Sequence, residues 1–332
     1  MSAIRLSICI ATINRAALLS ETLVSIASQV SDEVEVIIVD SSSNSETEKI
    51  VAGFGSLCAN LRYVWQPLKF DEAYCKAVEL ARGEYCWLFT DDDLLKTGAV
   101  AAILEACRTS AGLIVVNSEV RNADFSFCLE RRRLPVEADH IYTGASQDQV
   151  LADLGMYLSF IGAVVIKRDL WRTRQKPRHL DSLFVHMCVI FESPLEVDTL
   201  LIAHPWIVIR YGNALWRSQS FEIWMFKFPE LIWSFQGFAD WAKAKVERRE
   251  PWRRWRRLIM MRAMDRYSID QYRNWIKPRL KSLPQRTLAR AIACTPITPL
   301  NLLAQMFLTL TGKVQSLAMV DLKAWQNRSF AH

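Results

Sequence analysis

Three consecutive carboxylates, Asp91, Asp92 and Asp93, follow an apolar run in the stretch YCWLFTDDD. An apolar strand that ends in Asp-x-Asp suits a divalent cation held against a diphosphate, because Mg2+ and Mn2+ prefer oxygen ligands. In an extended chain Asp91 and Asp93 would point to the same side and could face one ligand. A cation there would neutralise the charge that develops on a leaving diphosphate. The stretch therefore predicts a metal-assisted site for a diphosphate compound.

A purely structural explanation of the same carboxylates is the start of a helix. Aspartate is favoured at helix caps and in first turns, and residues from Leu94 onward could be helical. This explanation accounts for one aspartate well and for a second acceptably. It does not explain three of them directly after a buried strand.

The first hundred residues alternate between strand and helix patterns. The predicted strands cover residues 6–11, 35–39, 61–65 and 85–89, and the predicted helices cover residues 16–29, 46–54 and 71–82. Continuously apolar strands that alternate with helices indicate a parallel sheet covered on both faces. Ligands of such sheets bind beyond the carboxyl ends of the strands. Thr12, Asp40 and the three carboxylates lie at such ends, so their loops are expected to converge on one crevice.

The rest of the chain is predicted to complete an α/β fold with a mostly parallel central sheet and a helical C-terminal extension. Strand patterns recur at residues 112–120, 160–167 and 200–211, and the sequence becomes helical, basic and Trp-rich from about residue 220. We expect a catalytic domain over residues 1–215, divided into halves at 1–110 and 111–215. A helical region is expected over residues 216–332.

Composition and cysteine use favour a globular protein of a reducing compartment. The chain has 332 residues, of which 51% are apolar, and a net charge of +6. Its eight cysteines are scattered without a C-x-x-C pair, which favours core thiols over a zinc site or a disulfide framework. The N-terminus lacks the pattern of a signal peptide, and no apolar run reaches about 18 residues. A cytoplasmic location is therefore expected.

Four stretches in a fixed order carry a family resemblance. ICIATINR, VIIVDSSS, ARGEY and WLFTDDDLL resemble the nucleotide-sugar-binding half of family 2 glycosyltransferases with the GT-A fold, over roughly residues 4–105. The stretch FDEAYCKAVELARGEYCWLFTDDD is most similar to the abequosyltransferase-like branch, which adds sugars to bacterial lipid-linked polysaccharide intermediates of the O-antigen type. The resemblance implies a nucleotide-sugar donor, a lipid-linked oligosaccharide acceptor, Mn2+ or Mg2+ as cofactor, and inversion of the anomeric configuration.

The resemblance also implies roles for individual residues. Asp40 would accept an N–H hydrogen bond from the base, Asp91 and Asp92 would approach the ribose and diphosphate, and Asp93 would bind the metal. The residues assigned in this way to the nucleotide sugar are Thr12, Asn14, Arg15, Asp40, Ser42, Lys69, Asp71, Asp91 and Asp92.

Two departures from the family pattern bear on these roles. Ala11 stands where proline is common, and Cys75 stands where the wider family often has asparagine. The second departure lies close to Lys69 and Asp71. For these two residues an ordinary helix start capped by Asp71 is an equally good explanation.

An inverting transferase needs a carboxylate that deprotonates the acceptor hydroxyl. The family usually supplies it from an E-D-x-x-L motif, and the nearest match, HLDSLF at residues 179–184, nominates Asp181 without the preceding glutamate. An exposed aspartate at a helix start is the competing explanation, and Glu192 and Asp198 are reserves. The resemblance further suggests His186 as a metal ligand, although a lone histidine in an apolar stretch is more often structural; His204 ranks lower.

A basic, Trp-rich segment covers residues 243–262. If a helix begins at Pro251, then Trp252, Trp255 and Ile259 share one face, opposite a basic face. Such a helix suits an anionic membrane surface and predicts peripheral contact with the cytoplasmic face of the inner membrane. Packing of the apolar face on the catalytic domain is an equal alternative. Nucleic-acid binding is disfavoured because no known motif for it is present.

Two rival functions remain from the residues alone. A non-catalytic nucleotide-sugar-binding or membrane-adaptor protein of the same fold is favoured by the weak base motif. A nucleotidyltransferase is disfavoured, because the turn at residues 11–17, ATINRAA, lacks the glycines of a phosphate-binding loop.

Overall fold

The computed structural model describes residues 3–55, 60–175 and 177–329 and divides the chain into two compact units. The first unit comprises residues 1–121, 130–210 and 234–246, and the second comprises residues 122–129, 211–233 and 247–332. The change at residue 211 lies close to the predicted boundary at residue 215. The short segments 122–129 and 234–246 group with the opposite unit.

The parallel half of the central sheet is built from four strands. They are β1 (Leu6–Thr12), β2 (Val34–Asp40), β3 (Leu61–Trp65) and β4 (Tyr85–Phe89), in the order β3-β2-β1-β4. In the register, Leu6 lies opposite both Val34 and Tyr85. Each strand lies within one residue of its predicted bounds, and the predicted parallel arrangement is confirmed.

The sheet continues beyond β4 with antiparallel strands. The order is β4-β9-β6-β10-β5, formed by β9 (Val164–Lys167), β6 (Leu113–Asn122), β10 (Thr199–Tyr211) and β5 (Leu94–Leu95). Two short strands complete the set, β7 (Cys128–Glu130) after β6 and β8 (His140–Tyr142) paired with β10. Within the strand predicted at residues 160–167, Ile161–Ala163 form a 3-10 turn instead of extended chain.

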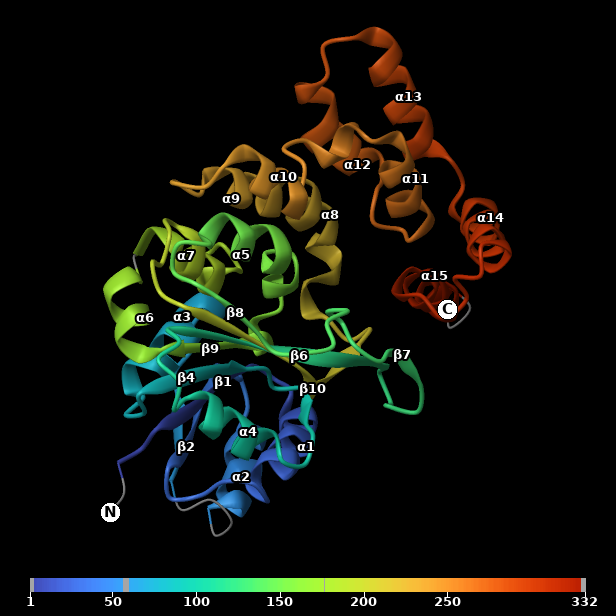
Figure 1. The fold of residues 1–332 in the computed structure, drawn as a ribbon. Helices are drawn as coiled ribbons and strands as arrows, with labels where there is room; N and C mark the ends of the chain where they lie inside the picture. The colour runs from blue at the N-terminus through green and yellow to red at the C-terminus, as the bar shows by residue number, and fades with distance from the viewer. Residues whose placement is uncertain (1–2, 56–59, 176, 330–332) are drawn as a thin grey trace. The chain divides into compact units, whose positions relative to one another are not determined.

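Helices cover both faces of the sheet in the first unit (Figure 1). One face carries α1 (Ala16–Ala27), α2 (Glu46–Phe54) and α4 (Ala99–Ala106). The other face carries α3 (Phe70–Leu80), α5 (Gln147–Leu154), α6 (Arg168–Arg174) and α7 (Val185–Phe191), with α10 (Asp240–Val246) packed on α5. Helices thus bury both faces of a mixed sheet in which the strands β3-β2-β1-β4 are parallel.

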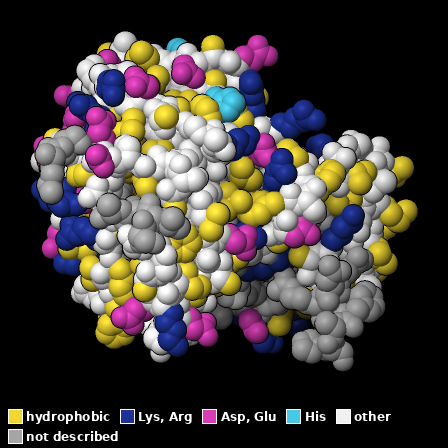
Figure 2. All heavy atoms as spheres, turned by 90° about the horizontal axis from the view of Figure 1, so that it is seen from below, with side chains coloured by type: hydrophobic (Ala, Val, Ile, Leu, Met, Phe, Trp, Pro, Cys, Tyr) yellow, Lys and Arg dark blue, Asp and Glu magenta, His cyan; other side chains and the backbone are white. Residues whose placement is uncertain are grey.

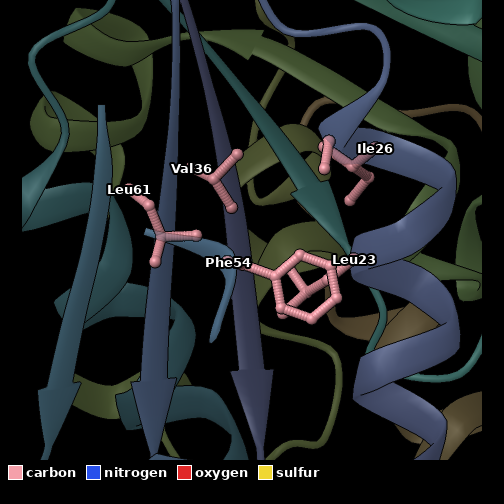
Figure 3. Close-up of a pocket in the computed structure, with 6 residues that line it drawn as sticks. Leu23, Ile26, Val36, Phe54 and Leu61 are labelled. Atoms are coloured by element: carbon pink, nitrogen blue, oxygen red, sulfur yellow. The ribbon is translucent and has the colours of Figure 1, made fainter. Parts of the chain in front are cut away.

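The main core lies between the sheet and the first group of helices. Figure 3 shows Leu23 and Ile26 of α1 facing Val36 and Leu61 of the sheet, with Phe54 of α2 beside them. The side chains that line this small pocket are all apolar, so it is a gap in the core that offers no polar or reactive group to a ligand. The apolar faces of α1 and α2 support the strands, and the buried Thr22 hydroxyl of α1 donates to the carbonyl of Asp93 over 2.8 Å.

The second unit is helical. Its helices are α8 (Ser220–Glu222), α9 (Phe228–Ser234), α11 (Trp255–Ala263), α12 (Ile269–Gln271), α13 (Leu283–Cys294), α14 (Ile297–Leu310) and α15 (Leu317–Ser329). The ring of Phe226 stacks on both Trp252 and Trp275 at the centre of its core. Aromatic packing of this kind contributes more than its buried area alone.

The predicted Trp-lined membrane face at Pro251 is not formed. Pro251 begins only a 3-10 turn, and α11 starts at Trp255, so Trp252 and Trp255 do not share a helix. Trp252 is buried in the core of the second unit, whereas Trp255 is half exposed. Burial of the large indole of Trp252 outweighs the amphipathic pattern that the sequence indicates.

The described cysteines are free thiols, as expected. Five are buried: Cys9, Cys75, Cys86, Cys107 and Cys188. Cys58 lies outside the described residues. Burial of these thiols matches the prediction that most of them are core residues.

Candidate active site

The loops after β1 and β4 meet at the carboxyl ends of these strands. The Thr12 hydroxyl donates to the Asp91 carboxylate over 2.8 Å. The Arg15 guanidinium bridges two carboxylates, with 2.9 Å from Nη1 to Asp91 and 2.9 Å from Nη2 to Asp92. Four residues predicted to contact the nucleotide sugar are thereby brought together at one edge of the sheet. Charge-assisted bonds of this kind are among the stronger hydrogen bonds in proteins.

Asp93 is turned into the protein. Its Oδ2 accepts a 2.5 Å hydrogen bond from the Thr90 hydroxyl, and its Oδ1 accepts one of 2.8 Å from the Arg210 backbone N–H. Asp93 is 2% exposed, whereas the side chain of Asp92 is 13% exposed. The chain bends at residues 91–92, so the expected extended geometry, with Asp91 and Asp93 on one side, does not hold. The geometry favours Asp92 over Asp93 as the carboxylate that can reach a ligand.

Burial leaves Asp91, Asp92 and Asp93, hereafter the carboxylate cluster, with an excess of negative charge. Burial and the nearby charge of Asp92 raise the pKa of Asp91 to about 6, although Arg15 and Thr12 oppose the shift. Burial, followed by repulsion from Asp92, raises the pKa of Asp93 well above its ordinary value. Desolvation and like charges both disfavour the ionised form of a carboxyl group. The cluster is therefore a place where a bound cation would relieve repulsion.

The donor atoms of the cluster fit a hard divalent cation, but they do not form a complete shell. Among the described residues, no three His, Cys, Asp or Glu side chains converge as a metal site by themselves. Mg2+ and Mn2+ often take only one or two protein carboxylates, with phosphates and water as the other ligands. The site thus has the chemistry of a cation held jointly by protein and diphosphate.

His186 does not belong to this set. It is fully buried in α7, and its Nε2 lies 2.8 Å from the carbonyl oxygen of Leu158. Burial lowers its pKa to about 4, which keeps the imidazole neutral. The prediction that His186 completes the metal shell is replaced by a role in the core, because its ring is enclosed and bonded there. The lower-ranked His204 is exposed on β10 against Trp206.

Asp40 supports the loop that follows β2. It is fully buried, and its oxygens accept hydrogen bonds of 2.8 Å each from the Ser42 N–H and the Tyr63 hydroxyl. The Ser42 hydroxyl in turn accepts a 2.7 Å bond from the N–H of Asn14, which adopts a left-handed backbone with φ +52°. These bonds connect the loops after β1 and β2. Contact between Asp40 and a nucleotide base stays a prediction.

Asp71 has a structural role that neither prediction named. Lys69, not Asp71, caps α3, and the buried Asp71 carboxylate reaches across to the start of α7. It accepts hydrogen bonds from the N–H of Leu183 at 2.8 Å, the N–H of Val185 at 3.2 Å and the Ser182 hydroxyl at 3.2 Å. Asp71 therefore supports the turn at residues 181–185, and its contact with the donor stays a prediction.

Asp181 stands at the outside of that turn. Its side chain is 63% exposed, and it pairs with Lys69 over 2.7 Å. Asp181 and Leu183 both have left-handed backbones, with φ of +76° and +65°, which is strained for residues that carry a Cβ. The strained turn is held from within by Asp71 and carries Asp181 outward.

The reserve candidates for the catalytic base are both engaged. Glu192 pairs with Arg178 and with the imidazole of His179, and Asp198 accepts the N–H of Gly144 at 3.0 Å. Asp181 is the most exposed of the three carboxylates. This favours Asp181 among the predicted candidates.

Arg210 is a member of the site that sequence analysis missed. Its N–H holds Asp93, its Nε donates to the carbonyl of Asp92 over 3.0 Å, and its Nη2 pairs with Glu21 at 2.5 Å. The guanidinium adds a positive charge beside the cluster. The available signal was a single arginine near the end of the apolar strand β10, where a buried charge needs a partner.

Comparisons with known proteins agree with this geometry. Residues 7–172 match the protein family described as Glycosyl transferase family 2. The chain is 25% identical over 225 residues to abequosyltransferase RfbV of Salmonella typhimurium, covering 63% of this chain and 67% of that protein. The branch that the motifs indicated is thus represented among its relatives.

Two solved glycosyltransferases share the fold. The structure of TarS 1-349 from S. aureus has a TM-score of 0.58 at 12% identity, covering 98% of this chain and 92% of TarS 1-349. The mannosyltransferase PcManGT from Pyrobaculum calidifontis, in complex with GDP-Man and Mn2+, has a TM-score of 0.54 at 15% identity, with 97% and 87% coverage. The predicted GT-A fold is confirmed. The chain belongs to glycosyl transferase family 2 and is a glycosyltransferase.

Proposed function

We propose that this enzyme transfers a sugar from a nucleotide-sugar donor to a hydroxyl of a lipid-linked oligosaccharide during bacterial surface polysaccharide synthesis. The observation that carries the donor part is the bridge from Arg15 to Asp91 and Asp92 at the end of β4. Support comes from relatives of the same fold, because TarS structures contain UDP or UDP-GlcNAc and PcManGT contains GDP-Man. The abequosyltransferase relative supports an acceptor of the polysaccharide type.

A divalent cation is part of this proposal. Asp92, aided by Asp91, would hold Mn2+ or Mg2+ against the diphosphate, and Asp93 would support them from behind through Thr90 and Arg210. When bound, the cation supplies positive charge that stabilises the leaving nucleoside diphosphate. Arg15 holds the carboxylates of Asp91 and Asp92 in place for this task.

We assign the acceptor chemistry to Asp181. The acceptor oxygen attacks the anomeric carbon, its proton passes to the Asp181 carboxylate, and the bonding electron pair leaves with the diphosphate. Attack from the face opposite the leaving group inverts the configuration. Lys69 pairs with Asp181 over 2.7 Å, and this contact raises the pKa of Lys69.

The location follows from the substrates in this proposal. Nucleotide sugars are soluble, whereas a lipid-linked acceptor lies in the bilayer. The enzyme would therefore act peripherally on the cytoplasmic face of the inner membrane. The nucleotide sugar would then stay in water and the lipid of the acceptor in the bilayer during the transfer.

The transfer proposal is tested by supplying UDP-, GDP-, CDP- and dTDP-linked sugars with a lipid-linked oligosaccharide fraction, with Mn2+ or with EDTA. One donor class should give labelled lipid product, and EDTA should remove the activity. Activity that is indifferent to EDTA would contradict the role of the cation. Donor binding without turnover on any acceptor would instead support a non-catalytic protein.

A further inference from the structure

Helix α14 is held to its unit by one side, which buries Asn301, Ala304 and Leu308, and its other side presents large apolar side chains to solvent. Five large apolar side chains form the α14 outer face: Leu302, Leu303, Met306, Phe307 and Leu310. Phe307 is 62% exposed and Leu310 is 85% exposed. At about 100° per residue, their spacing places all five on one side of the helix, within less than half of its circumference.

The inner side of α14 is anchored by amide hydrogen bonds. The buried Asn301 donates to the carbonyl of Ala263 at 2.9 Å and to that of Leu322 at 3.1 Å. Gln305 donates to Asn301 over 2.7 Å. Ala304 and Leu308 lie on the same inner side and pack with Ala263, Met319 and Leu322. Because α14 is already held to its unit by this inner side, the five large apolar side chains of the outer face are not needed for that packing and are available to an apolar partner.

The chain segment that contains α14 carries charges of one sign. Residues 271–320 contain no Asp or Glu, and their seven basic residues are Arg273, Lys277, Arg279, Lys281, Arg286, Arg290 and Lys313. Arg290 and Lys313 are both exposed, and the residues between them carry no charge. Hydrophobic side chains gather at the right-hand edge of Figure 2, where Figure 1 places α14. The apolar face is thus bordered by basic residues along the chain.

With 14 residues, α14 alone is shorter than the roughly 20 apolar residues of a membrane-spanning helix. No single helix in the described part of the chain is long and apolar enough to span a membrane. Only together do α13 and α14 have the length and apolar composition of a membrane span, and they are bent by 94° at their junction. An apolar face with basic borders is the arrangement of helices that lie in the lipid interface.

We propose that the α14 outer face docks on the surface of an anionic lipid bilayer, with Phe307 and Leu310 inserted among the acyl chains. Arg290 and Lys313 would meet the lipid phosphates. A second copy of the chain is a poorer occupant, because two basic borders would repel each other. The inference rests on the proposed function only for the position of the acceptor, and it moves membrane contact from the predicted Trp face to α14.

The test uses the full chain and vesicles of phosphatidylcholine, alone or with about one third phosphatidylglycerol. The variant Phe307→Ser/Leu310→Ser removes apolar groups that contact solvent, so its melting temperature should stay that of the wild type. Its binding to the anionic vesicles should be weaker by about tenfold or more. The matched control is Val24→Ser, which alters an apolar residue of α1 that is as exposed as Phe307 and should leave vesicle binding unchanged.

A second variant, Arg290→Gln/Lys313→Gln, tests the charge complementarity. It should lose most of the preference for anionic over neutral vesicles and keep the apolar contribution. Wild-type binding by the Phe307→Ser/Leu310→Ser variant would overturn the proposal. So would a wild-type dimer that this variant dissociates while vesicle binding is unchanged.

Donor binding in the same samples separates this inference from the proposed function. The vesicle-binding variants should bind nucleoside diphosphate normally. An Asp92→Asn variant should bind vesicles normally. If the wild-type protein binds nucleoside diphosphate but not vesicles, the docking surface is refuted. If it binds vesicles but no nucleoside diphosphate, the donor site is refuted.

Discussion

The Asp71 carboxylate accepts a 2.8 Å hydrogen bond from the N–H of Leu183, which lies 112 positions further along the chain. Two residues before Asp71, Lys69 pairs with Asp181 over a similar span. The start of α3 therefore holds the strained turn that carries the proposed base. One short segment links the donor side of the fold to the acceptor chemistry.

Removal of Asp71 should lower turnover more than donor binding. Asp71→Ala leaves the N–H groups of Leu183 and Val185 without their acceptor, which should lower the free energy of unfolding by about 1–3 kcal/mol. The turn should relax, so kcat should fall while the dissociation constant of the donor stays near that of wild type. The matched control is Glu79→Gln on the exposed side of α3. A lower melting temperature with unchanged kcat would show that Asp71 has only a structural role.

Isosteric variants of Asp92 and Asp93 should show which carboxylate binds the cation and which one only supports the site. Asp92→Asn should abolish the stimulation by Mn2+ and keep the melting temperature, because Asp92 is the more accessible carboxylate. Asp93→Asn should keep most of the metal response, since an amide can still bond to Thr90 and Arg210. The measurement is the metal dependence of donor hydrolysis. Loss of the metal response in Asp93→Asn but not in Asp92→Asn would restore Asp93 as the ligand.

Stability and metal affinity should depend on pH in opposite directions. The pKa of Asp91 is about 6 in the fold against an ordinary 3.8, so its contribution to stability is present below that ordinary value and is lost as pH rises through 6. Asp93 acts in the same sense. Without metal, the melting temperature should fall between pH 5 and 7, within the window set by the pKa of Asp91.

The cation competes with the protons of these carboxyl groups. The dissociation constant of Mn2+ should therefore rise by about tenfold for each pH unit below 6. Calorimetric titration at several pH values measures this slope. A constant affinity for Mn2+ between pH 5 and 7 would exclude Asp91 from the cation site.

Arg15→Gln should destabilise the carboxylate cluster. The substitution removes two charge-assisted hydrogen bonds from side chains that are largely buried, at a cost of about 1–3 kcal/mol. It should also raise the pKa of Asp91 further, because Arg15 opposes that shift. Denaturant unfolding at pH 7.5 gives the free energy. Arg108→Gln, which breaks an exposed pair with Glu105, is the control and should change little.

Local patterns were sufficient to predict the donor half of the fold. Strands β3 and β4 and helix α2 have the predicted bounds, because continuous apolar runs and helical periodicity are properties of short stretches. The convergence of Thr12 with Asp91 followed from a rule about the ends of parallel strands. Both inferences required only sequence neighbours and a known topology.

The parts that could not be predicted depend on residues far apart in the sequence. The bond from Arg210 to Asp93 joins residues 117 positions apart, and no local pattern at either residue indicates it. The inward turn of Asp93 follows from that bond and from the bend at residues 91–92. The burial of Trp252 likewise follows from packing against Phe226, which competes with the helical pattern after Pro251.

Calorimetric titration of wild type and Asp92→Asn with UDP, GDP, CDP and dTDP, each with and without Mn2+, tests the proposed donor site most directly. One nucleoside diphosphate should bind wild type in the presence of Mn2+, and its affinity should fall by about tenfold or more in EDTA or in Asp92→Asn. If the variant with Mn2+, or the wild type in EDTA, bound this nucleotide as tightly as the wild type with Mn2+, the role of the carboxylate cluster would be contradicted. Absence of binding by all four nucleotides to the wild type would contradict the donor site itself.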